Sequence, residues 1–187
     1  MATSAPLCRA EESQLLLVDV QERLAAAMPE AARARMLRAA GLLLEAAARL
    51  AIPVHATEQY PQGLGPTVAA LAAKLPAART LEKTAFSCCA AEGFADAIAA
   101  TGRRQVVLAG METHICVLQT ALELHALGYH VFVVEDAVCS RIEAHAANGL
   151  QRLRAAGVTV TNSESVLFEW LRDSRHEHFK ALSALLK

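Results

Sequence analysis

The chain has 187 residues, of which 54% are hydrophobic, 20% are charged and 4% are aromatic. This length suffices for one buried core, so we expect a single domain over residues 1–187, with residues 1–12 as an irregular N-terminal segment. The hydrophobicity excludes intrinsic disorder, and a formal net charge of −1 without a basic block argues against a nucleic-acid partner. Because no apolar leader or membrane-spanning run is present, we expect a cytoplasmic protein without a membrane partner.

Strand and helix patterns alternate along the chain. Short apolar or β-branched runs predict strands over 14–20, 52–57, 80–83, 105–110, 129–134 and 158–161. Ala- and Leu-rich stretches with helical spacing predict helices over 29–50, 67–75, 92–100, 113–127, 143–156, 163–171 and 176–186, with a loop over 58–66. This alternation is typical of the α/β class. It predicts a three-layer αβα sandwich with a central, mainly parallel six-stranded sheet.

The cysteines do not form a recognisable disulfide or zinc pattern. There are five of them, and none is spaced as CxxC. We expect reduced thiols, with Cys8, Cys88, Cys89 and Cys139 inert, although the role of the adjacent Cys88 and Cys89 stays open. Cys116 differs from these four because it lies near the start of the helix predicted over 113–127, just after a predicted strand.

Polar side chains lie at the carboxyl ends of the predicted strands. In a parallel sheet, ligands bind beyond these ends, so such positions are candidate site residues. They are Asp19, Thr57, Glu58, Lys83, the stretch after Gly110, and Asp136.

Three of these positions combine into a reactive set. Cys116 comes three residues after Thr113, which we expect to cap the helix over 113–127. The amino end of that helix would lower the pKa of the thiol and supply N–H groups to an oxyanion. Asp19 is then a candidate base and Lys83 a candidate cation. The structural alternatives are a buried hydrophobe, a helix cap and a solvated lysine, respectively.

The ordered motifs Leu16–Gln21, Glu82–Ser87 and Gly110–Cys116 resemble those of the isochorismatase-like cysteine hydrolases. The resemblance extends over about residues 14–171. The loop Thr57–Gly65 makes the chain most similar to the small isochorismatase-domain proteins within that family.

The resemblance implies an Asp–Lys–Cys catalytic triad of Asp19, Lys83 and Cys116. It also implies a cis peptide bond between Met111 and Glu112, in a turn that forms the oxyanion hole with Cys116. The family fold is a six-stranded parallel sheet between helices. Its members assemble as homo-oligomers, so we expect a dimer or a tetramer.

The resemblance also implies that the metal site of related enzymes is absent. Nicotinamidases of this superfamily bind a metal through Asp and His residues after the second strand. Here residues 58–61 read Glu-Gln-Tyr-Pro, and no histidine follows His55 in that region. We therefore expect no metal and no cofactor, which argues against a nicotinamidase.

Three further residues are candidates for contacts with the substrate. Gln21 lies two residues beyond Asp19 and could bind the substrate or orient the base. Phe86 is a candidate pocket wall, and Glu112 flanks the nucleophile turn. Together these features predict a metal-independent cysteine hydrolase for a small molecule with an amide-type C–N bond or a vinyl-ether bond. The alternative is a non-catalytic scaffold or interaction protein that retains the hydrolase fold.

Overall fold

The computed structural model describes residues 7–75 and 80–186. Residues 1–6 of the expected irregular N-terminal segment lie outside the described residues. The rest of that segment is partly regular, because Ala10–Glu12 forms a 3-10 turn directly before the first strand.

The described strands form one parallel sheet, which confirms the predicted fold class. The strand order is β3-β2-β1-β4-β5-β6, and every pairing is parallel. The strands are β1 (Ser13–Val18), β2 (Val54–Gln59), β3 (Thr80–Lys83), β4 (Gln105–Met111), β5 (His130–Cys139) and β6 (Thr159–Thr161). Because β1 and β4 are central, the residues that follow them meet in the middle of one sheet edge.

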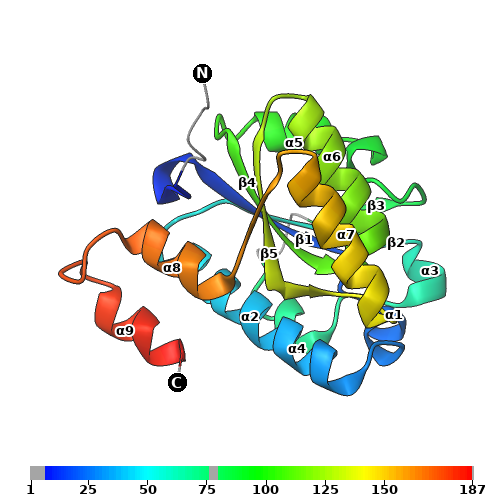
Figure 1. Cartoon of the computed structure of the whole chain (residues 1–187), viewed down its shortest axis with the longest axis horizontal. Coiled ribbons are helices and arrows are strands. Elements are labelled where there is room, and N and C mark those ends of the chain that lie inside the picture. Colours follow the sequence, from blue (N-terminus) through cyan, green and yellow to red (C-terminus); the bar gives the residue numbers. More distant parts are fainter. Residues whose placement is uncertain (1–6, 76–79, 187) are drawn as a thin grey trace.

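Helices cover both faces of this sheet, as Figure 1 shows. The helices are α1 (Glu22–Ala26), α2 (Glu30–Arg49), α3 (Pro61–Leu64), α4 (Ala69–Ala72), α5 (Phe94–Ala99), α6 (Leu118–Ala126), α7 (Glu143–Ala155), α8 (Ser163–Leu171) and α9 (Phe179–Ser183). On one face, α2 and α8 pack on the sheet; on the other, α5, α6 and α7 do.

Alternate residues of β1 belong to the two separate cores. Leu15 and Leu17 pack with α2, whereas Leu16 and Val18 pack with α5 and α6. Side chains of a strand point alternately to the two faces, and both faces here are covered. This explains why β1 is a continuous apolar run rather than an alternating pattern.

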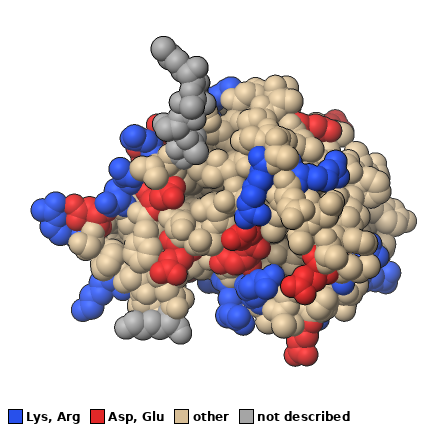
Figure 2. All heavy atoms as spheres, viewed as in Figure 1, with Lys and Arg blue, Asp and Glu red and all other residues tan. Residues whose placement is uncertain are grey.

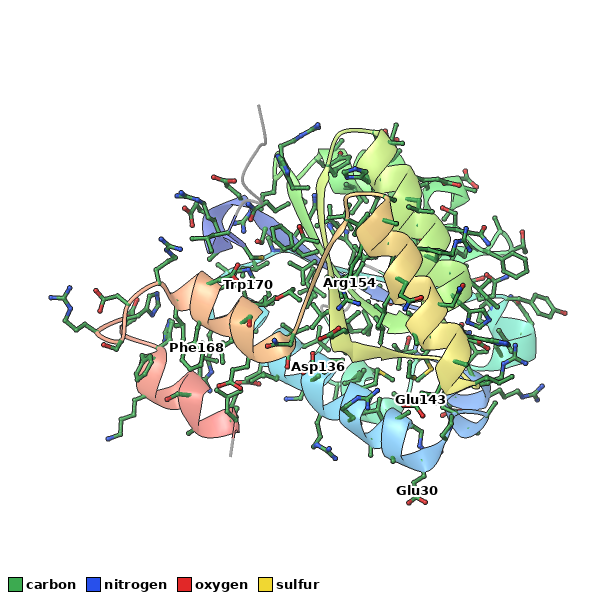
Figure 3. The ribbon with its side chains drawn as sticks, in the orientation of Figure 1. Glu30, Asp136, Glu143, Arg154, Phe168 and Trp170 are labelled. Atoms are coloured by element: carbon green, nitrogen blue, oxygen red, sulfur yellow. The ribbon has the colours of Figure 1, made fainter. Side chains whose placement is uncertain are left out.

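The fifth strand ends later than predicted, which changes the position of Asp136. The strand does not stop at residue 134 but continues to Cys139, so Asp136 lies within β5 and not at its exit. Its carboxylate accepts hydrogen bonds from Ser163 N (2.8 Å) and Ser163 Oγ (2.5 Å), between β5 and the start of α8 (Figure 3). Asp136 therefore connects the sheet to α8 and does not belong to the site.

Other boundaries differ mainly in short, turn-rich segments. The helix expected over 67–75 is reduced to α4, and the loop expected over 58–66 contains α3. The last predicted helix is α9 followed by a 3-10 turn at Ala184–Leu186. These segments make few of the buried contacts that stabilise longer helices, so their local patterns are weak predictors.

Gly110 allows β4 and β1 to approach closely just before the site. Its φ is 134°, and a Cβ atom there would lie 2.1 Å from the carbonyl oxygen of Val18, the residue before Asp19. Only glycine fits a backbone contact of this kind at a positive φ.

Within residues 7–75 and 80–186, no helix combines the length and apolar character that crossing a membrane requires.

Candidate active site

Asp19 is a buried carboxylate in a left-handed backbone conformation. It follows β1 directly, its φ is 51°, and its side chain is fully buried. Among non-glycine residues, Asp and Asn adopt this conformation most readily. A positive φ at a buried charged residue costs free energy, so contacts with the surrounding structure must stabilise this conformation. Residues in such conformations often lie at functional sites.

Lys83 forms a buried ion pair with Asp19. Its Nζ lies 2.6 Å from Asp19 Oδ2, and it also donates to Gln59 Oε1 at 2.8 Å. The carbonyl oxygens of Ala85 and Phe86 accept from the same nitrogen at 3.2 and 3.0 Å. The solvated surface lysine that was one alternative is therefore excluded, because every donor of this ammonium faces a protein acceptor.

Cys116 lies in a π-helical segment (Thr113–Val117) that leads into α6. The residue is 6% exposed, and its thiol lies close enough to Asp19 and Lys83 for both charges to act on it. Burial and, after it, the Asp19 carboxylate raise the pKa of the thiol to about 12, against the opposing effect of Lys83. The lowered pKa expected from the helix end is wrong, because burial and a neighbouring negative charge outweigh it.

The expected cap of this helix is also wrong. Thr113 lies inside the π-helical segment, and its hydroxyl is buried without a hydrogen-bond partner among the described residues. The residue in the cap position is Glu112, whose side chain makes no capping bond.

Lys83 and Cys116 therefore both lie beside the Asp19 carboxylate. Asp19 accepts a hydrogen bond from the Lys83 ammonium, and its charge acts on the Cys116 thiol. Asp19 follows β1, Lys83 ends β3, and Cys116 lies in the π-helical segment after β4, at the same edge of the sheet. In the resting state the thiol keeps its proton, and the carboxylate is placed to take that proton when the sulfur attacks an electrophile. The set has the composition of a nucleophile, a base and a cation.

Thr57 and Gln59 complete the surroundings of the ion pair. The hydroxyl of Thr57 donates to Asp19 Oδ1 at 2.7 Å. Gln59 accepts from Lys83 and donates through Nε2 to the carbonyl of Thr84 at 2.6 Å. The position of Thr57 at a strand end indicated a site residue, but its partner could be named only from the register that sets it opposite Val18.

Gln21 holds the loop beside the site. Its Nε2 donates to the carbonyls of Gln59 (3.0 Å) and Gly65 (2.7 Å), and its Oε1 accepts from Gln59 N at 2.7 Å. Both of its N–H donors are thus directed to backbone acceptors. These side-chain bonds go to the backbone of Gln59 and Gly65 and not to the Asp19 carboxylate.

Glu112 belongs to a second polar cluster rather than to the ion pair. The Met111–Glu112 peptide bond is cis, and the buried Glu112 carboxylate accepts from Arg141 through Oε1. Its Oε2 has no hydrogen-bond partner among the described residues and lies 3.5 Å from His114 Nδ1. The groups that act on the Cys116 thiol are Asp19, Lys83 and Cys88.

Phe86 contributes its backbone to the site. The residue is 54% exposed, and its carbonyl oxygen accepts from Lys83. A cavity of about 250 Å³ lies beside Lys83 and is lined in part by Tyr60, Glu82 and Glu92. Neither Phe86 nor Cys116 lines that cavity.

The five cysteines are all free, as expected. Across the part of the chain that the structure describes, no group of three or more His, Cys, Asp or Glu side chains is arranged to hold a metal ion.

Comparison with known proteins places these features in a family. Residues 13–165 match the isochorismatase domain. Isochorismatase domain-containing protein 2 of Xenopus laevis is 37% identical over 177 residues, covering 93% of this chain and 83% of that protein. Isochorismatase domain-containing protein 1 of Danio rerio is 42% identical over 148 residues, 78% of this chain, and the chain matches about half (51%) of that protein's length.

Three solved structures share the whole fold. MAR1 ribonuclease from Caenorhabditis elegans has a TM-score of 0.88 at 34% identity, covering 95% of this chain and 91% of that one. YcaC from Pseudomonas aeruginosa, solved with hexane-2,5-diol and covalent acrylamide, has a TM-score of 0.92 at 26% identity and coverages of 99% and 92%. YcaC from Escherichia coli, described as an octameric hydrolase of unknown specificity, has a TM-score of 0.86 at 28% identity and coverages of 95% and 88%. With the domain match and these relatives, the chain belongs to the isochorismatase-domain family.

Proposed function

We propose that this protein is a metal-independent cysteine hydrolase for a small molecule with an amide-type C–N bond or a vinyl-ether bond. The observation that carries the proposal is the buried Asp19 carboxylate, which pairs with the Lys83 ammonium and whose charge acts on the buried Cys116 thiol. A structural role alone does not explain why a thiol and an ion pair are buried together at the carboxyl edge of a parallel sheet.

For an amide, the reaction follows from the contacts of Asp19. The Cys116 sulfur bonds to the carbonyl carbon while its proton passes to Asp19. Backbone N–H groups of the turn that contains Met111, Glu112 and Cys116 would stabilise the oxyanion. Asp19 returns the proton to the nitrogen as the C–N bond breaks and the amine leaves. Water then attacks the thioester, gives a proton to Asp19, and releases the acid and the thiol.

Lys83 acts through Asp19 in this scheme. Its ammonium is fully buried and surrounded by four acceptors, so we propose that it pairs with Asp19 and orients that carboxylate rather than touching the substrate. Gln59 and Gln21 then act as positioning residues, because Gln59 orients Lys83 and Gln21 holds the Gln59 backbone.

With a vinyl ether, the same groups would act differently. Protonation of the enol-ether carbon by an acid is the step that activates the substrate, and no acyl intermediate forms. Cys116 and Asp19 would then share the proton that is transferred. Trapping of a covalent thioester during turnover distinguishes the two reactions.

The relatives support the class of reaction. The Escherichia coli neighbour is described as a hydrolase, and the Pseudomonas aeruginosa neighbour carries covalent acrylamide. Acrylamide is an electrophile of the kind that adds to thiolates.

The similar structure from Caenorhabditis elegans is named a ribonuclease, which suggests RNA as a second substrate class. The charge of this chain favours a small molecule instead. Its formal net charge is −1, and basic and acidic side chains are interspersed on the face that Figure 2 shows. Glu82 and Glu92 beside the cavity would repel a phosphate backbone.

We also propose that the protein is a homo-oligomer. Tyr60, Phe86 and Ile142 are large apolar side chains that are more than half exposed, and each follows the carboxyl end of a strand. The octameric neighbour supports self-association. Light scattering during size exclusion tests this point, and a monomer at all concentrations would contradict it.

The hydrolase proposal is tested with a substrate panel of small amides, isochorismate and RNA, each with and without a chelator. The wild type is compared with Cys116→Ala and with Cys89→Ala as the matched control. We expect hydrolysis of one small molecule, insensitive to chelator and abolished only in Cys116→Ala. Undiminished turnover in Cys116→Ala would contradict the nucleophile. No turnover of any substrate, together with an unreactive Cys116, would support the scaffold alternative.

A further inference from the structure

Cys88 is a second buried thiol beside Asp19. It begins a 3-10 turn (Cys88–Ala90) after β3 and is fully buried. Its Sγ lies 3.4 Å from Thr57 Oγ1, and the same hydroxyl lies 2.7 Å from Asp19 Oδ1. The proposed reaction does not use this thiol.

The direction of these hydrogen bonds follows from counting protons. An ionised carboxylate has no proton, so the single hydroxyl proton of Thr57 is donated to Asp19. Thr57 Oγ1 can then only accept from Cys88, whose S–H must be the donor. Burial, followed by the charge of Asp19, raises the pKa of the Cys88 thiol to about 11, so this donor keeps its proton near neutral pH.

Cys88 is also connected to the helix that carries the nucleophile. Its backbone N–H donates to Thr120 Oγ1 at 2.9 Å. Thr120 is four residues after Cys116, so the two side chains lie on the same side of that helical segment, one turn apart. Cys88 is therefore bonded through its thiol to the hydroxyl that contacts Asp19, and through its backbone to the helix that follows Cys116.

We propose that Cys88 is a positioning residue that directs the hydroxyl proton of Thr57 onto Asp19 and so moderates the negative charge that faces the Cys116 thiol. The inference rests on the proposed hydrolase function and assigns a role to a thiol outside the triad. A chain of hydrogen bonds strengthens each member, so donation from Cys88 makes Thr57 a better donor to the carboxylate. With less charge on Asp19, the Cys116 thiolate forms more readily.

Several neighbouring groups influence the pKa of the Cys116 and Cys88 thiols. Asp19, Lys83 and Cys88 act on Cys116. Asp19, Lys83, Thr57 and Thr120 act on Cys88. Substitutions at Cys88 leave Asp19 and Lys83 in place. The direct influence of Cys88 raises the pKa of Cys116, so its loss alone would speed labelling, and slower labelling reports on the hydrogen bonds from Cys88 through Thr57 to Asp19.

The test is the rate at which acrylamide labels Cys116 at about pH 8, followed by mass spectrometry of the Cys116 peptide. The variants are Cys88→Ala, which removes the donor, Cys88→Ser, which retains one, and Thr57→Val, which removes the hydroxyl. Cys89→Ala is the matched control, because this half-buried neighbouring thiol takes no part in the hydrogen bonds from Cys88 through Thr57 to Asp19. Circular dichroism confirms that each variant is folded, and Cys88→Val replaces Cys88→Ala if the latter does not fold.

We expect labelling of Cys116 to slow about tenfold in Thr57→Val and about two- to threefold in Cys88→Ala. Cys88→Ser and Cys89→Ala should stay within about 1.5-fold of the wild type. Equal slowing in Cys88→Ala and Cys88→Ser would show a packing effect and overturn the inference, as would no slowing in Cys88→Ala. A wild type whose Cys116 is never labelled would contradict both this inference and the proposed function, whereas a labelled Cys116 that is insensitive to Cys88 would contradict only the inference.

Discussion

Lys83 Nζ lies 2.6 Å from Oδ2 of Asp19, and neither side chain is exposed to solvent. The pair joins the ends of β1 and β3, which flank β2 in the sheet. An ion pair that is buried this fully is sensitive to the loss of either partner, because the remaining charge has no solvent to stabilise it.

Lys83→Met should therefore lower the free energy of unfolding by roughly 3–5 kcal/mol. The double variant Lys83→Met with Asp19→Asn should recover part of this loss, because no buried charge is left unpaired. Arg49→Met is the control, since its pair with Glu45 is partly exposed and should contribute less than about 1 kcal/mol. Urea unfolding measures all three. A double variant less stable than Lys83→Met would contradict the argument.

Asp19→Asn should separate thiol reactivity from turnover. The Asp19 carboxylate raises the pKa of Cys116, so its removal should shift the pH profile of Cys116 alkylation to lower pH, while burial keeps the pKa above its ordinary value. Turnover should nevertheless fall by about 10²–10⁴-fold, because the proposed base is lost. Asparagine also tolerates the left-handed backbone at this position. Parallel alkylation and activity profiles check both effects; a slower alkylation would contradict the first.

Much of this site could be predicted from local sequence patterns. Asp19, Lys83 and Cys116 each follow or end a recognisable element, and parallel strands bring such positions to one edge. The burial of Lys83 could not be predicted, because it depends on acceptors from Gln59, Ala85 and Phe86 that the chain brings together only on folding.

The thiols show why the remaining features were missed. The raised pKa of Cys116 comes from burial and from a charge on another strand, which outweigh the helix end that the sequence makes visible. The contact of Cys88 with Thr57 joins a short 3-10 turn to β2 and has no periodic pattern. Short segments such as α3 and α4 depend on their tertiary surroundings for the same reason.

Gly110→Ala should be among the most destabilising single substitutions outside the triad. Its Cβ would lie 2.1 Å from the backbone oxygen of Val18, which cannot move without displacing Asp19. We expect a loss of more than about 3 kcal/mol or failure to fold. Gly102→Ala is the matched control, because its φ is also positive but a Cβ there meets nothing within 4 Å. That variant should lose only about 1–2 kcal/mol. Equal effects in urea unfolding would contradict the steric explanation.

Arg141 should stabilise the fold more than an exposed arginine pair does. Its partner Glu112 is only 5% exposed, so Arg141→Met leaves a buried carboxylate without its cation. We expect a loss of about 1–3 kcal/mol. The control is Arg154→Met, whose pair with Glu135 is about half exposed and should contribute less than about 1 kcal/mol. Thermal and urea unfolding compare them, and a larger loss in Arg154→Met would reverse this ranking.

The nucleophilic role of Cys116 is the central claim, and trapping of the covalent intermediate tests it most directly. The wild type is mixed with the amide substrate identified in the panel, quenched in acid during turnover, and analysed by intact mass and peptide mapping. The account predicts an acyl adduct on the Cys116 peptide that is absent from Cys116→Ala and present in Cys89→Ala. A wild type that turns over an amide without any adduct, while Cys116→Ala retains full activity, would contradict it.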